Sequence, residues 1–194
     1  ISISGVLTFV SAPDYETKST YSAVVTVSDG DNQTTQNITV NITNVNDIAP
    51  VISSSSIFSA EENQTAIGTV IASDDEGDDL TYSISGSEIL ISSSGVLTFV
   101  SAPDYETKST YTSTITVNDG VNSTAQNITV NVTNINDNSP VISSSATFSA
   151  AENQTSIGEV TATDADGDDL TYSISGSEIL ISSSGVLTFV STPD

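Results

Sequence analysis

Residues 95–104 read GVLTFVSAPD, and this stretch decides the fold because the chain contains it three times. The same letters begin at Gly5, and GVLTFVSTPD begins at Gly185, so the repeat length is 90 residues. The surrounding sequence repeats as well, since EENQTAIG at 61–68 returns as AENQTSIG at 151–158. A fixed period of this length predicts a tandem array of small structural units rather than one large domain.

The phase of the repeat divides the chain into one complete unit and two partial ones. Pro50 and Pro140 stand in equivalent linkers, where a fixed φ and a missing amide donor suit a crossing between units better than a central strand. The predicted boundaries are 1–47 for the C-terminal part of one repeat, 48–137 for a complete repeat, and 138–194 for the N-terminal part of the next.

Each repeat consists of short segments rich in Val, Ile, Thr and Tyr, in which apolar and polar residues alternate. Near the end of the complete repeat, Ile128, Val130 and Val132 fall on one face of a predicted strand. The predicted strands lie near 57–60, 67–73, 80–85, 88–92, 96–100, 111–118 and 125–133. This pattern predicts an all-β fold of tandem seven-stranded Greek-key β-sandwiches of immunoglobulin-like type, joined end to end.

The apolar core of such a repeat is modest because aromatic residues are few and tryptophan is absent. The predicted core positions of the complete repeat are Phe58, Val70, Leu80, Tyr82, Ile84, Leu97, Phe99, Tyr111, Ile115, Val117 and Val130. A domain of this size is marginally stable unless something else supports it.

The charge balance is strongly acidic, with 25 Asp and Glu residues against Lys18 and Lys108, and a net charge of −23. Nucleic acid is excluded as a partner because binding a phosphate backbone requires many Lys and Arg side chains. No apolar run approaches the roughly 18 residues of a membrane helix, so no membrane insertion is expected in this segment. Soluble cations are the partners that the charge favours.

Catalysis has little support in the residue types present. The chain has no His and no Cys, so its many Ser residues lack a general base, and no catalytic residue is predicted. The acidic pairs that resemble those of a glycosidase recur in every repeat. A motif that repeats with the fold is more typical of a structural role. The chain is therefore expected not to be an enzyme.

Acidic residues recur in loops at the ends of the predicted strands. They lie at Glu62, in the turn 74–79, in the triplet 104–106 and in the linker 134–137, with Asp119 directly after its strand. Any one of these alone is equally typical of a solvated turn. Their recurrence together favours a binding site at the poles of the sandwich.

In type and order these loops resemble the calcium-binding motifs of the cadherin family. That family has a Glu followed by Asn, then DxD, (L)DxE and DxG motifs, and a linker of the form DxNDNxP. The resemblance covers the whole chain and implies cadherin-like tandem repeats. The near-identity of neighbouring repeats, the acidity and the scarcity of Lys favour a large microbial surface adhesin or extracellular filament protein. The resemblance implies Ca²⁺ bound between neighbouring repeats of the same chain.

The resemblance also implies two sets of ligands, one at each junction. The set near 44–50 is Asp14, Glu16, Asn44, Asn46, Asp47, Asp74, Glu76 and Asp119. The set near 134–140 is Glu62, Asp104, Glu106, Asn134, the backbone of Ile135, Asn136, Asp137, Asp164 and Asp166. All are oxygen donors, which suit calcium better than magnesium and exclude the usual zinc and copper sites.

Three features depart from the family pattern. The first linker Asp is Asn at 44 and 134, the DxD turns are short, and Ile48 replaces the Asn seen at 138. The number of ions at each junction stays open as a result. The series Asp164, Asp166 and Asp168 begins like an EF-hand, but Gly167 falls at the fourth place instead of the sixth.

The function predicted from these observations is a structural calcium-binding array that forms a rigid extracellular spacer or fibre shaft for cell adhesion. Two alternatives remain open at this point. One is a carbohydrate- or partner-binding module, and the other is a self-assembling extracellular filament subunit, with copies of itself or a cell-surface ligand as partners. The expected location is extracellular, at the cell surface.

Overall fold

The computed structural model describes residues 1–2 and 4–194, and all regular elements in that part of the chain are β-strands. No helix among those residues could span a membrane. Contacts divide the chain into two compact units. The first comprises residues 1–56, 68–98 and 112–128, and the second comprises residues 57–67, 99–111 and 129–194.

The strands are short, as the turn-rich sequence predicts. Those of the first unit are β1 (Thr20–Ser28), β2 (Gln33–Asn41), β3 (Val51–Ile52), β6 (Ala72–Ser73), β7 (Thr81–Ile84) and β8 (Ile89–Ile91). Those of the second are β4 (Ile57–Glu61), β12 (Val141–Ile142), β13 (Ser156–Glu159), β14 (Ala162–Thr163), β15 (Ile179–Ile181) and β16 (Val186–Phe189). Four strands have residues in both units: β5 (Ala66–Thr69), β9 (Val96–Phe99), β10 (Thr110–Asn118) and β11 (Ser123–Thr133).

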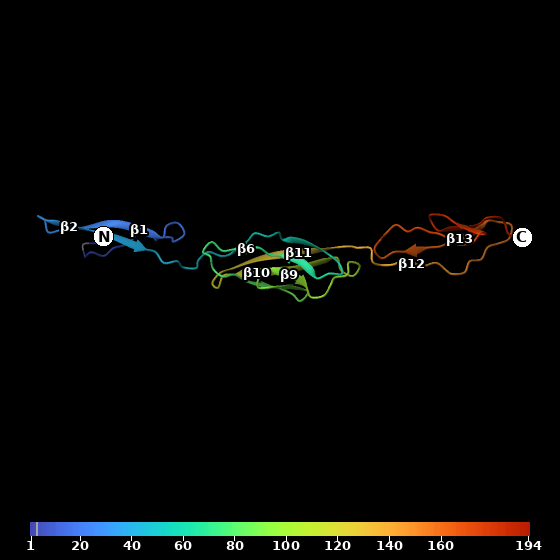
Figure 1. Cartoon of the computed structure of the whole chain (residues 1–194), viewed down its shortest axis with the longest axis horizontal. Helices are drawn as coiled ribbons and strands as arrows, with labels where there is room; N and C mark the ends of the chain where they lie inside the picture. The colour runs from blue at the N-terminus through green and yellow to red at the C-terminus, as the bar shows by residue number, and fades with distance from the viewer. Residues whose placement is uncertain (3) are drawn as a thin grey trace. The chain divides into compact units, whose positions relative to one another are not determined.

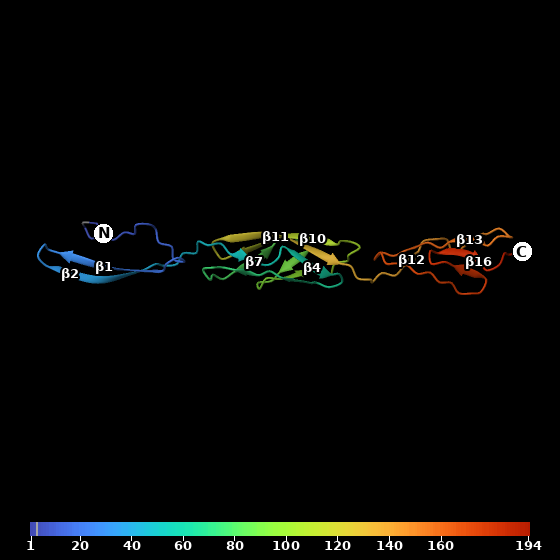
Figure 2. The ribbon, with the colours of Figure 1, turned by 90° about the horizontal axis from the view of Figure 1, so that it is seen from above.

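In the first unit, β1 and β2 form an antiparallel hairpin, seen in blue in Figures 1 and 2, in which Thr20 faces Asn41. Strand β10 pairs with β7 in antiparallel register, with Ile115 opposite Ile84. The buried apolar side chains of this unit are Val70, Ile89, Leu97, Ile115, Val117 and Ile128. They come from β8, β9, β10 and β11 and from the residue after β5, and they form its core.

In the second unit, the end of β11 runs parallel to β4, with Val130 opposite Phe58. Strands β13, β16 and β15 form an antiparallel sheet, and Figure 2 shows β13 beside β16 in the red part of the chain. The buried apolar residues here are Ala60, Phe99, Val130, Val132 and Leu187.

The strand order confirms the predicted all-β sandwich. One sheet has the order β4-β11-β10-β7 and the other β5-β9-β8, so each mixes strands that are distant in sequence. The segment predicted as one strand over 67–73 is divided into β5 and β6. Val70 still bonds to Gly95 beside β9, whereas the carbonyl of Ile71 accepts the N–H of Ser53 next to β3. The chain changes sheets at this point, which an apolar pattern cannot reveal.

The core contains positions that the sequence prediction left out. Ile89 is 1 % exposed, and Ala60, Ile128 and Val132 are also buried. Five predicted core residues are only half-buried, namely Phe58, Leu80, Tyr82, Ile84 and Tyr111. Leu80, Tyr82 and Ile84 lie on or beside β7 and Phe58 lies on β4; these are the two outer strands of the sheet, where one side of the strand has no neighbour.

Candidate metal centre

Glu62 follows β4 and is 3 % exposed, which is unusual for a carboxylate. Its two oxygens accept backbone N–H groups from two separate segments. Oε2 accepts the N–H of Tyr105, and Oε1 accepts the N–H of Ile135, each at 2.8 Å. Glu62 therefore joins the 104–106 loop to the linker after β11.

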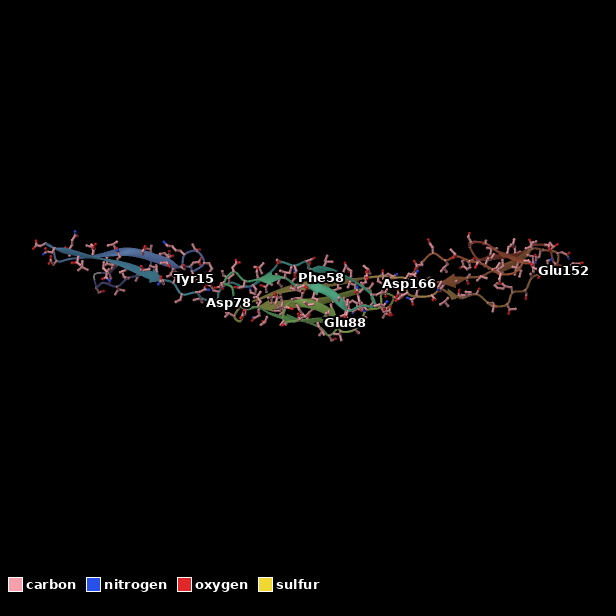
Figure 3. All side chains as sticks on the ribbon, in the orientation of Figure 1. Tyr15, Phe58, Asp78, Glu88, Glu152 and Asp166 are labelled. Atoms are coloured by element: carbon pink, nitrogen blue, oxygen red, sulfur yellow. The ribbon has the colours of Figure 1, made fainter. Side chains whose placement is uncertain are left out.

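Four carboxylates gather beside this connection. One oxygen from each of Glu62, Glu106, Asp137 and Asp166 lies within 4.8 Å of the other three. They come from three loops and the turn after β14, which Figure 3 marks by the label at Asp166. Ligand atoms converging from separate segments are what a cation site requires.

Amide groups of the linker hold the carboxylates in place. Oδ2 of Asp166 accepts the backbone N–H groups of Asp137 at 3.2 Å and Asn138 at 2.8 Å. The Asn138 side chain donates to Asp137 at 2.8 Å, to Asp166 at 3.1 Å and to Glu106 at 3.3 Å. Asn63 donates its side-chain amide to Asp137 as well. Neutral donors, which add no charge, thus order an acidic cluster.

The electrostatics of this cluster are unfavourable for anions. Desolvation raises the pKa of Glu106, and the negative charges of Glu62 and Asp166 add to that rise. The pKa of Asp166 is instead lowered, first by the hydrogen bond from the Asn138 side chain. A cation would relieve the repulsion that Glu106 experiences.

The other residues predicted for this junction occupy different positions. Asp104 bonds within its own loop, accepting the hydroxyl and the N–H of Thr107 at 2.8 and 3.2 Å, and this lowers its pKa. Asn134 donates its amide to the carbonyl of Asp166 at 2.9 Å, and Asp164 accepts the N–H of Asp166 at 3.0 Å. Asn136 lines a neighbouring groove. The geometry brings none of these into the four-carboxylate cluster.

The equivalent junction in the first unit gathers Glu16, Asp47 and Glu76, again with oxygens within 4.8 Å of one another. Oε2 of Glu76 accepts the backbone N–H groups of Asp47 and Ile48, each at 2.8 Å. The hydrogen bond at the backbone of Glu16 lowers its pKa, but desolvation and the negative neighbours Asp14 and Glu76 outweigh it and leave the pKa raised.

Two oxygen atoms of this junction have no hydrogen-bond partner although they are buried. They are Oδ2 of Asp74 and Oε1 of Glu76, and both residues also belong to a close group with Asp78. A buried carboxylate oxygen without a partner is costly, and a bound cation is one way to satisfy it. The residues present fit a calcium ion by donor type and by this unmet demand.

Two further predicted ligands form hydrogen bonds within this junction, and a third lines a cavity there. Asp14 accepts the hydroxyl of Thr17 at 2.8 Å, and Asn44 lines a small cavity of about 290 Å³ beside Glu16 and Glu76. Asn46 donates to the carbonyl of Asp119 at 3.3 Å.

Asp119 is 6 % exposed and closes the loop between β10 and β11. Its Oδ1 accepts the N–H groups of Val121 at 2.7 Å and Asn122 at 2.6 Å. Burial alone would raise the pKa of Asp119, but these hydrogen bonds outweigh burial and lower it. The Asn122 side chain then reaches Asn46 at 2.8 Å, which ties the loop to the linker.

Several residues in these sites were missing from the predicted ligand sets. Asn138 and Asn122 act as side-chain amide donors, a role that a search for oxygen ligands does not detect. Asp78 and Asp168 each lie two residues beyond the predicted acidic pair of their turn and join the same close group. Asn63 follows the buried Glu62, and Asn153 follows its counterpart Glu152. Both Asn residues have a positive φ, 62° for Asn63 and 64° for Asn153. Asn tolerates this backbone conformation better than most residues, which explains why Asn follows Glu at both positions.

Comparison with known proteins supports the same fold. Residues 46–133 match the family model described as bacterial Ig domain. Among curated proteins the sequence finds no match. A crystal structure of mouse cadherin-23 repeats EC22–24 is similar with a TM-score of 0.76 and 23 % identity, covering 94 % of this chain and 67 % of that one.

Two protocadherin structures agree with it. The protocadherin gammaB7 EC3–6 cis-dimer has a TM-score of 0.78 and 24 % identity over 93 % of this chain and 54 % of that one. The protocadherin gammaB4 extracellular domain has a TM-score of 0.75 and 25 % identity over 94 % of this chain. This chain spans 33 % of the gammaB4 chain. The chain therefore consists of cadherin-like β-sandwich repeats, and its middle repeat matches a bacterial immunoglobulin-like domain.

Proposed function

We propose that this chain is part of an extracellular adhesion array in which Ca²⁺ at the repeat junctions stiffens the linkers. Cadherin-like and immunoglobulin-like extracellular domains fit an adhesion or spacer role. The observation that carries the proposal is the convergence of Glu62, Glu106, Asp137 and Asp166 within 4.8 Å. We also propose that one repeat ends at residue 47 and the next spans residues 48–137, with a further repeat beginning at residue 138.

The residues that would hold an ion are those whose oxygens already converge. At one junction they are Glu62, Glu106, Asp137 and Asp166, and at the other Glu16, Asp47 and Glu76. Calcium accepts six to eight oxygen ligands in flexible geometry, so carbonyl, amide and water oxygens could complete each shell. When bound, it would supply positive charge at sites where the carboxylates repel one another.

The chain's own residues would turn that binding into stiffness. Glu62 fixes the loop at Tyr105 and the linker at Ile135, while Asp166 fixes the linker at Asn138. One linker is thus held from both sides by carboxylates of the same cluster. Closing the cluster would restrain the backbone on each side of it, so ion binding would stabilise the folded loops as well.

A spacer role follows from the repetition of this arrangement. A motif that returns with every repeat supports a function that is the same at each junction. The absence of His and Cys and the excess of acidic residues support neither catalysis nor nucleic-acid binding. We assign the array to a large microbial surface adhesin or filament.

Calcium titration of the 194-residue chain tests the proposal. Isothermal calorimetry should show binding that millimolar magnesium does not replace, and thermal unfolding in calcium should occur at a higher temperature than in chelator. The double variant Glu106→Gln with Asp166→Asn should lose the site between the middle and last repeats, whereas Glu178→Gln, an exposed control, should keep it. Equal melting temperatures in calcium and chelator would contradict the proposal.

A further inference from the structure

The Asn residues of the middle repeat follow a pattern that neither the fold nor the calcium proposal explains. Within residues 48–137, four of the seven Asn residues have Thr two positions further along the chain. The same segment contains 12 Thr, so composition alone would place Thr at that position after about one Asn. Asn-x-Thr is the acceptor pattern for N-linked glycosylation, which attaches a sugar to the side-chain amide nitrogen of Asn. The four acceptors are Asn63, Asn122, Asn127 and Asn131.

Two of these acceptors use their amide nitrogen to hold a junction together. Nδ2 of Asn63 donates to Asp137, a member of the four-carboxylate cluster. Nδ2 of Asn122 donates to the Asn46 side chain at 2.8 Å and to the carbonyl of Ile48 at 3.4 Å. A sugar on either nitrogen would have to occupy the space in which the linker lies. The folded structure therefore has no room for a sugar at these two positions.

The other two acceptors lie on the outward face of β11. Asn127 and Asn131 are exposed, whereas Ile128, Val130 and Val132 on the opposite face are buried. Successive side chains of a strand point to opposite faces of the sheet, so both Asn side chains point away from the core. Since the ladder hydrogen bonds are made by the backbone, a sugar on these side chains would extend into water without breaking the sheet.

The side chain of Asn127 is already oriented for such an attachment. Its Oδ1 accepts the hydroxyl of Thr114, on the neighbouring strand β10, at 2.8 Å. The sugar would be carried by Nδ2, which this bond does not involve. Replacing one hydrogen of Nδ2 by a sugar leaves Oδ1 free to accept the same hydroxyl. The attachment therefore preserves the contact that fixes the side chain.

The position of Asn131 also leaves room for a sugar. Its cross-strand neighbour on β4 is Ser59, whose side chain is small. Asn131 lies four residues after Asn127, a distance of about 13 Å along an extended strand. Sugars at both positions would project from the same face without competing for one site.

We infer that Asn127 and Asn131 are N-glycosylated. In each case Nδ2 attacks the anomeric carbon of a glycosyl diphosphate, the carbon–nitrogen bond forms and the bond to the diphosphate breaks. One Nδ2 proton passes to a base of the transferase, and nothing is oxidised or reduced. Because β11 is an inner strand of its sheet, the transferase must act before this part of the chain has folded. The inference goes beyond the adhesion proposal and does not depend on calcium, since neither Asn belongs to the predicted ligand sets.

Mass spectrometry of the protein isolated from its own cells tests the inference. Cleavage before Asp releases residues 119–136, which contain three of the acceptors, and residues 47–73, which contain Asn63. Fragmentation should locate sugars on Asn127 and Asn131 and none on Asn63 or Asn122. Absence of sugar from all four, or equal occupancy of all four, would overturn the inference. A single hexose would identify a nucleotide-activated sugar as the donor, and a preassembled oligosaccharide would identify a lipid-linked donor.

Two Thr substitutions in those cells provide reciprocal controls. Thr129→Val removes the hydroxyl of the Asn127 acceptor, and Thr133→Val removes that of the Asn131 acceptor. Val has the same branched shape and an equal preference for strands, so the sheet should be retained. Each variant should lose the sugar of its own acceptor and keep the other. Unchanged occupancy in both variants would show that the attachment does not use the Asn-x-Thr pattern.

Chemical attachment tests whether the fold distinguishes the two kinds of position. The chain has no cysteine, so Asn127→Cys and Asn122→Cys each provide one thiol. Each variant of the 194-residue chain is coupled in denaturant to a maleimide-linked oligosaccharide and then refolded. In urea the coupled Asn127→Cys chain should unfold at the same midpoint as its uncoupled form, whereas coupling should lower the midpoint of Asn122→Cys. Equal shifts for the two variants would contradict the structural part of the inference.

Discussion

Oε1 of Glu62 accepts the backbone N–H of Ile135 at 2.8 Å, although the two residues are 73 positions apart. Glu62→Gln should therefore destabilise the fold even without calcium. One oxygen remains to accept, but the amide nitrogen faces a backbone donor and leaves it unsatisfied. The expected loss is about 2 kcal/mol of unfolding free energy.

Urea unfolding in chelator measures that loss. Glu61→Gln is the matched control, because Glu61 is the neighbouring residue and is exposed. Equal stability of the two variants would show that the buried carboxylate is not the link between the loop and the linker.

Glu106→Gln, in contrast to Glu62→Gln, should not destabilise the fold in the absence of calcium. Desolvation and the charges of Glu62 and Asp166 raise the pKa of Glu106, so its charged form is disfavoured in the ion-free fold. Removing the charge relieves that repulsion, and stability in chelator should stay equal or rise slightly. Calcium affinity should fall about tenfold because a charged ligand is lost. Calorimetry together with urea unfolding separates the two effects, and a fall in stability without a change in affinity would contradict the assignment.

Gly95 and Gly77 form a matched pair with nearly equal backbone conformations, φ being +81° and +82°. A Cβ at residue 95 would lie 2.5 Å from the carbonyl oxygen of Val70, whereas one at residue 77 would meet nothing within 4 Å. Gly77→Ala should cost about 1 kcal/mol for the left-handed conformation alone. Gly95→Ala should cost more than about 2 kcal/mol, because the backbone of Val70 must also move. Urea unfolding of both variants checks this, and equal losses would contradict the close approach.

Asp119 and Asp29 form the same turn in two repeats, one buried and one exposed. Asp119→Asn should lower the melting temperature more than Asp29→Asn. The new amide group at position 119 would face backbone N–H donors at a buried position, whereas position 29 is exposed to water. The pKa of Asp119 is lowered from the ordinary 3.8. Its contribution to stability is therefore present above that value and lost as the pH falls through the lowered pKa.

Thermal melts in chelator between pH 7 and pH 2 would show this. Asp119→Asn should have a shallower loss of stability in acid than the unchanged protein. Parallel curves would indicate that the Asp119 carboxylate is not coupled to folding.

Alternation of apolar and polar residues predicted most of the sheet-forming segments because it encodes a half-buried strand, but it gave no signal for the two-residue strand β3. Ile128, Val130 and Val132 illustrate the alternation, and all three are buried. The alternation could not predict the change of sheet after Val70, which depends on the partner strands and not on the segment itself.

The acidic loops were predictable as a group, and their detailed roles were not. Asp104 and Glu106 are two residues apart, yet only Glu106 reaches the four-carboxylate cluster, because Asp104 bonds its own Thr107. Asn138 orders that cluster with neutral amide groups, and composition gives no signal for such a role. Local hydrogen bonds decide which carboxylates remain available to a cation.

Small-angle scattering, coupled to size-exclusion chromatography to isolate the monomer, tests the central claim that calcium stiffens the junctions. Profiles are recorded in millimolar calcium and in excess chelator at matched ionic strength. The account predicts a profile of fixed, larger maximum dimension in calcium and a flexible one in chelator. Superimposable profiles in the two conditions would contradict it, because the acidic junctions would then be solvated loops that calcium does not restrain.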